Sequence, residues 1–193
     1  MRSRLPEATK LGFLRLIKPF ERSTEDVIKI TRAFGIALRI HNGKFRDENI
    51  VDPYINHPLK VALLITEELR ILEADLICAA LLQDTLGSDE DLLKEFGGPI
   101  HEILQVSNMP SFKKEEREKM LSEYFNNLSN SSLSTRYLVL ADRLENVRAL
   151  KNTSHKHKIS RYKEETEKYI IPLALKTDEN VAFKLSIALY ELR

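Results

Sequence analysis

Residues 79–86 read Ala-Ala-Leu-Leu-Gln-Asp-Thr-Leu, and in this stretch an apolar run ends in two polar side chains, Gln83 and Asp84. The apolar run predicts a buried helix. A buried amide or carboxylate must find a partner or remain solvated, so two interpretations are open. Either the helix reaches the surface at Gln83, or Asp84 points into a functional site.

The composition is that of an ordinary soluble globular protein, with 42% apolar and 31% charged residues in a chain of 193. The formal net charge of +1 argues against broad electrostatic binding to nucleic acid or membranes. No apolar run approaches the roughly 18 residues that span a bilayer. The single cysteine, Cys78, excludes a disulfide framework and is more simply a small core residue than a nucleophile. We therefore expect a cytoplasmic protein without nucleic-acid or membrane partners.

Apolar residues recur with helical spacing along most of the chain, which predicts a single all-α domain over residues 1–193. A basic amphipathic helix is expected near the N-terminus, with Leu11, Phe13, Leu14, Leu16 and Ile17 buried. Further helices are expected at about residues 24–41, 58–71, 73–85, 88–96, 99–107, 113–125, 135–150, 159–175 and 178–192. No strand is expected. The segment 44–56 reads as a long loop, a kind of element that is often functional, and 126–132 reads as a flexible one.

Three polar side chains interrupt or begin apolar helices: His57, Asp84 and Asp142. Asn146 follows Asp142 one turn later on the same helix face. Helical bundles hold divalent ions with imidazole and carboxylate groups from separate helices, so these residues are candidates for one site. His57 has an alternative interpretation as a capping residue beside Pro58, and sequence separation alone does not decide between the two.

Five segments together resemble the HD-domain hydrolases of the RelA/SpoT type, and the overall length resembles the stand-alone small alarmone hydrolases. They are residues 39–46 (Arg-Ile-His-Asn-Gly-Lys-Phe-Arg), 53–62 (Pro-Tyr-Ile-Asn-His-Pro-Leu-Lys-Val-Ala), 79–85, 96–97 (Phe-Gly) and 140–148 (Leu-Ala-Asp-Arg-Leu-Glu-Asn-Val-Arg). The resemblance covers about residues 25–175 and implies an HD-domain helical bundle.

The resemblance also implies an activity, because this family removes the 3′-pyrophosphate from guanosine tetra- or pentaphosphate, usually with manganese and a metal-bound water. The implied metal ligands are His57, Gln83, Asp84 and Asp142. The implied substrate contacts are Arg46, Tyr54 and Asn146, and the fold would also direct cations of the basic stretch 151–163, such as Lys158 and Arg161, towards a phosphate. The alternative for that stretch is a solvated loop and helix start.

Two positions depart from the family pattern. Gln83 replaces the histidine of the His-Asp pair, and an amide oxygen is a poorer ligand than imidazole for manganese, so an oxygen-rich site tilts towards magnesium. The Glu-Asp pair expected a few residues later is absent, because the chain reads Gly87-Ser88 there. The acids at 89–91 could substitute only with a different backbone path, and as helix-start acids they already have a structural role.

Two hypotheses follow. The first is a metal-dependent pyrophosphohydrolase acting on a phosphorylated guanosine nucleotide, with an altered metal site. The second is a non-catalytic nucleotide-binding or protein-interaction module that keeps the fold. The sequence leaves activity, catalytic residues and oligomeric state open. His41 and His101 have no companions in the sequence and are expected to be ordinary structural or surface histidines.

Overall fold

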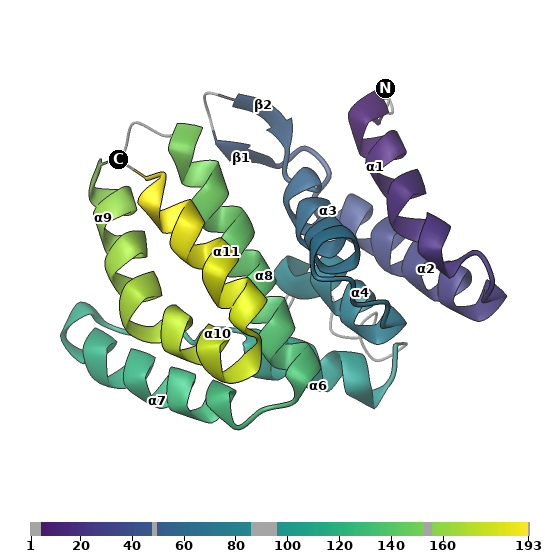
Figure 1. Cartoon of the computed structure of the whole chain (residues 1–193). Helices are drawn as coiled ribbons and strands as arrows, with labels where there is room; N and C mark the ends of the chain where they lie inside the picture. The colour runs from purple at the N-terminus through teal and green to yellow at the C-terminus, as the bar shows by residue number, and fades with distance from the viewer. Residues whose placement is uncertain (1–4, 48–49, 86–95, 153–155, 193) are drawn as a thin grey trace. The chain divides into compact units, whose positions relative to one another are not determined.

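The computed structural model describes residues 5–47, 50–85, 96–152 and 156–192 (Figure 1). It is 80% helical with two short strands, which confirms the all-α prediction. The chain forms two compact units, Met1–Gln105 and Val106–Arg193, here called unit 1 and unit 2. Among the described residues, no helix has the length and apolar character needed to cross a membrane. That residues 1–193 make one domain stays a prediction.

Unit 1 is built from helices and one hairpin. Its elements are α1 (Glu7–Ile17), η1 (Lys18–Phe20), α2 (Thr24–Ile40), β1 (Phe45–Asp47), β2 (Ile50–Pro53), α3 (Asn56–Leu63), η2 (Leu64–Glu68), α4 (Ala74–Leu82) and η3 (Gln83–Thr85). Helix α6 (Gly98–Ser107) follows the segment 86–95, which lies outside the described residues together with the short helix predicted there. The Oγ of Ser23 caps α2 by accepting from the backbone N–H of Asp26.

Helix α4 forms the centre of unit 1, between α2 and α3 (Figure 1). Every side chain from Leu76 to Leu82 is fully buried, so the helix is apolar on all sides, as expected for a core helix. The burial ends at the next residue, because Gln83 is half-buried and Asp84 is exposed. Asp84 also leaves helical geometry, with φ of −99° and ψ of 17°. The helix therefore ends where the sequence becomes polar.

Two sequence predictions fail in unit 1. The predicted loop 44–56 contains the antiparallel pair β1–β2, with Phe45 opposite Pro53, so the expectation of no strand was wrong. Three- and four-residue strands are too short to produce the alternating apolar pattern on which strand prediction depends. The expected burial of Leu11 and Leu14 was also wrong, because both are more than half exposed, whereas the expected burial of Leu16 is confirmed.

Unit 2 consists of helices. Its elements are η4 (Lys114–Glu116), α7 (Arg117–Ser129), α8 (Leu133–Ala149), η5 (Leu150–Asn152), α9 (Lys156–Glu165), η6 (Thr166–Ile170), α10 (Ile171–Thr177) and α11 (Glu179–Tyr190). Helix α8 contacts α7, α10 and α11. The predicted flexible segment 126–132 was wrong at its start, because α7 continues through Ser129. Ser132 then caps α8 by accepting from the N–H of Thr135 at 3.2 Å.

Candidate functional site

The first turn of α3 carries His57 and is fixed by its neighbour Asn56. The Thr9 hydroxyl of α1 donates to Asn56 Oδ1 at 2.7 Å, and the Asn56 amide donates to Asp52 of β2 at 2.5 Å. The α3 start is thus tied to α1 and to the hairpin. His57 itself is only 5% exposed. Its position inside the first turn explains why a pure capping interpretation is insufficient.

Four side chains meet where α3 and the end of α4 approach each other. Gln83 Nε2 lies 3.3 Å from His57 Nε2, and Asp84 Oδ2 lies 3.8 Å from the same ring nitrogen. The Tyr54 hydroxyl donates to Asp84 Oδ2 at 3.1 Å, and the Tyr54 ring meets the His57 ring edge-on at 6.0 Å. These contacts bring His57, Asp84 and Tyr54 together in unit 1, and their predicted roles in metal and substrate binding stay predictions. We call these four residues the His57 cluster.

The contact between Gln83 and His57 has a chemical consequence. With the amide oriented this way, its N–H donates to a neutral ring whose Nε2 carries the lone pair. This lone pair is the one that a metal ion would need from His57. Gln83 therefore supplies a weak oxygen ligand at best and also competes for the histidine beside it.

Sequence reasoning missed His41, which lies behind the His57 cluster. Its side chain is only 4% exposed, and its ring lies 4.8 Å from the Tyr54 ring. Neither ring nitrogen has a hydrogen-bond partner among the described residues. Burial lowers the pKa of His41 from 6.5 to about 4, and Lys44 and His57 add to this effect. The ring is thus neutral at physiological pH. Only the helix end at Asn42-Gly43 marked this position in the sequence.

Helix α8 of unit 2 carries the second predicted pair. The Asn146 amide donates to Asp142 Oδ2 at 2.9 Å, which confirms that the two share a helix face. Nearby, the Tyr124 hydroxyl donates to the Ser107 carbonyl at 2.6 Å. Burial raises the pKa of Tyr124, and the negative charge of Asp142 raises it further. That Asp142 shares a site with His57 and Asp84 stays a prediction.

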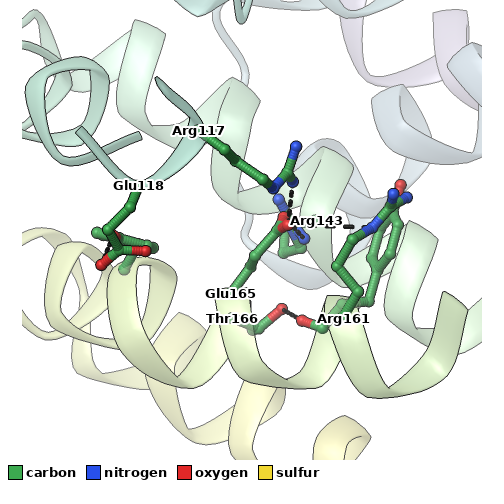
Figure 2. A network of polar contacts seen from close by, with 8 residues as sticks. Arg117, Glu118, Arg143, Arg161, Glu165 and Thr166 are labelled. Carbon is green, nitrogen blue, oxygen red and sulfur yellow. Dashed lines mark hydrogen bonds and ion pairs between the residues drawn. The ribbon is translucent and has the colours of Figure 1, made fainter. Parts of the chain in front are cut away.

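Arg161 of α9, a predicted substrate contact, belongs to a network of charged side chains. Its Nε lies 4.0 Å from Glu165, which also binds Arg117 and Arg143 (Figure 2). Sequence reasoning missed this network, because ion pairs between helices leave no mark in local spacing. Arg143 is the fourth residue of the Leu-Ala-Asp-Arg segment, but its neighbour Asp142 attracted the functional interpretation.

Other predicted site residues stay untested. Arg46 lies on β1 and is half-buried, and its contact with substrate stays a prediction. Lys158 lies on α9, but its side chain is outside the described part of the chain. Gly87 and Ser88, where the family pair of acids is absent, also lie outside the described residues, as do the acids at 89–91.

Within the described residues of unit 1, few strong metal donors lie together. No group of three or more His, Cys, Asp or Glu side chains that could hold a metal occurs among the residues described. In the described part of unit 1, His57 and Asp84 are the strong donors that lie together, and the Gln83 amide contacts the ring nitrogen of His57. Structural and catalytic zinc sites use at least three protein ligands. HD-domain hydrolases are generally dependent on divalent metals, and which residues of this chain would hold such an ion stays a prediction.

The model of the HD-domain family matches residues 33–178. The chain belongs to the HD-domain family. This HD-domain protein is 29% identical over 146 residues to the human guanosine-3′,5′-bis(diphosphate) 3′-pyrophosphohydrolase, covering 71% of this chain and 80% of the relative.

Two further relatives of this HD-domain chain are informative. It is 30% identical over 159 residues to the bifunctional (p)ppGpp synthase/hydrolase SpoT of Escherichia coli, which covers 78% of this chain and 22% of that protein. A solved structure described as a metazoan ortholog of SpoT that hydrolyzes ppGpp matches with a TM-score of 0.73 and 23% identity, over 84% of this chain and 94% of the other. The likeness confirms the HD-domain fold.

Proposed function

We propose that this HD-domain chain binds a guanosine nucleotide carrying a pyrophosphate and hydrolyses it far more slowly than relatives with a complete His-Asp pair. The ligand class rests on the relatives, whose names state an action on guanosine-3′,5′-bis(diphosphate) or (p)ppGpp. The slow hydrolysis rests on one observation, the 3.3 Å contact between Gln83 and the Nε2 atom of His57.

The residues have the following proposed roles. Arg46, Lys158 and Arg161 supply positive charge to the phosphates, while Tyr54 and Asn146 supply polar contacts. Guanidinium and amide groups suit these roles because they donate several hydrogen bonds in fixed directions. Any divalent cation held by His57, Gln83, Asp84 or Asp142 is expected to bind weakly, and amide and carboxylate oxygens favour magnesium over manganese.

Loss of the usual ligand and of the family acids should slow the reaction strongly. A single general acid or base is typically worth about 100- to 10,000-fold in rate. Phosphoryl chemistry depends mainly on electrostatic positioning, which Tyr54 and Asp84 still provide through their 3.1 Å hydrogen bond.

The test measures binding and turnover on the same protein. Guanosine tetraphosphate is titrated by calorimetry, and pyrophosphate release is then followed with magnesium or manganese. We expect saturable binding and release at least about 100-fold slower than for a relative with the complete pair. Ser122→Ala, an exposed change on α7, is the neutral control. Rapid turnover that disappears in Asp142→Ala would contradict the slow-hydrolysis proposal, and absence of nucleotide binding would favour a protein-interaction module.

A further inference from the structure

The most unusual charge arrangement in unit 2 surrounds Glu165 (Figure 2). Arg117 of α7, Arg143 of α8 and Arg161 of α9 all direct their guanidinium groups towards this one carboxylate. The Arg143 Nη1 atom lies 3.8 Å from Glu165 Oε2, and the Arg161 Nε atom lies 4.0 Å from Oε1. Three positive charges and one negative charge leave two positive charges in excess. We call these four residues the arginine cluster.

Arg143 is the part of the arginine cluster that a purely structural role explains least. Its side chain is 8% exposed, and its Nη1 atom makes no hydrogen bond to any described residue. Its single ionic contact, to Glu165, is longer than a hydrogen bond. A buried guanidinium with an unused donor is costly unless another acceptor reaches it. The Arg143 Nη1 atom therefore lacks a negatively charged hydrogen-bond acceptor among the described residues.

The other two guanidinium groups keep the arginine cluster open to solvent. The side chains of Arg117 and Arg161 are 35% and 57% exposed. Aromatic rings support all three groups, since Arg117 lies over Phe112, while Arg143 and Arg161 lie over Tyr162. Such stacking fixes the plane of a guanidinium and leaves its edge for an anion. The groups are thus positioned before any ligand arrives.

Glu118, which follows Arg117 on α7, contacts residues outside the arginine cluster. It pairs with Lys168, and the Tyr169 hydroxyl donates to it at 3.0 Å. These contacts hold the pKa of the fully exposed Glu118 below its ordinary value, with the Lys168 hydrogen bond as the main cause. Glu118 thus serves a separate pair with Lys168, and Glu165 is the acid that forms ion pairs with the three arginines.

We propose that the arginine cluster is an anion site that binds a phosphoryl or pyrophosphoryl group, with Glu165 as an internal counter-ion in the empty state. Guanidinium groups recognise phosphate through paired N–H donors, and two exposed arginines beside a buried one can surround such a group. The inference rests on the proposed function for the identity of the biological ligand. It extends the proposed function by adding Arg117 and Arg143 to Arg161 as residues that bind a phosphate group.

The test uses inorganic pyrophosphate as the probe, titrated by calorimetry into the full chain at low ionic strength, where charge contacts are least screened. Arg117→Met and Arg161→Met should each raise the Kd about tenfold, which equals one charge-assisted contact. Lys119→Met is the matched control, because Lys119 lies on α7, is 79% exposed and pairs only with Glu123. We expect less than a twofold change there. Circular dichroism checks that each variant is folded.

Glu165→Gln separates an anion site from a structural clamp. If the arginine cluster binds anions, removing the internal counter-ion should lower the Kd for pyrophosphate. If Glu165 only holds the helices together, Glu165→Gln should lower the stability of the protein without tightening pyrophosphate binding. The proposal is overturned by absence of saturable pyrophosphate binding, by equal weakening in Lys119→Met, or by unchanged or weaker binding in folded Glu165→Gln.

Guanosine tetraphosphate and guanosine, titrated in parallel, identify the source of the anion. Tighter binding of the tetraphosphate than of pyrophosphate, lost in Arg161→Met, supports a nucleotide as the source. Equal binding of both supports a free anion. The nucleotide function fails separately, through absence of guanosine tetraphosphate binding, so the two results are distinguishable.

Discussion

Lowering the pH should destabilise unit 1 through His41. Burial holds the pKa of this ring at about 4, whereas the unfolded chain has the ordinary value of 6.5. Between these two pH values the unfolded state binds a proton that the folded state does not, so stability falls as the pH falls. The loss from this group should reach about 2 kcal/mol between pH 7.5 and 5, and about 3 kcal/mol below pH 4.

Urea unfolding followed by circular dichroism at pH 7.5, 6 and 5 measures this dependence. The informative variant is His41→Phe, which keeps a ring beside Tyr54 and removes the two nitrogens that lack partners. Between pH 7.5 and 5, the free energy of unfolding of His41→Phe should fall by about 2 kcal/mol less than that of the wild type. Ser122→Ala, exposed on α7, should behave like the wild type. An identical pH dependence in His41→Phe and the wild type would refute the reasoning.

Further predictions concern the core and the single thiol. Burial raises the pKa of Cys78 to about 12, so a thiol reagent at pH 8 should label the folded protein only at the rate of unfolding; rapid labelling without urea would contradict this. Leu81→Ala should cost about 2–5 kcal/mol in urea unfolding, because Leu81 is fully buried. The matched change Leu14→Ala should stay within about 0.5 kcal/mol, since Leu14 is 57% exposed. Equal losses in the two leucine variants would contradict the described core.

Sequence patterns predicted the long helices because their apolar spacing is repeated over several turns. The central helix α4 is the clearest case, with its apolar run buried and its end at Gln83. The same reasoning identified the shared face of Asp142 and Asn146. Local signals of this kind depend only on residues a few positions apart, which a single sequence contains.

Features that depend on partners distant in sequence were not predictable. The hairpin β1–β2 is too short for an alternating pattern, and the exposure of Leu11 depends on which face of α1 the other helices cover. The same limit explains why His41 and the arginine cluster were missed. Arg117 and Glu165 are separated by 48 residues, and nothing in either local segment indicates the pairing.

The measurement that most directly tests the central claim is the manganese affinity of the wild type and Gln83→His. In the wild type, Gln83 contacts the Nε2 atom of His57 and supplies no imidazole. Restoring an imidazole beside His57 and Asp84 should tighten manganese binding by roughly 10- to 100-fold, the usual range for one supporting group at a metal site. Calorimetric titration gives both dissociation constants. Equal affinities in the two proteins would contradict the account, because Gln83 would then not be what weakens the site.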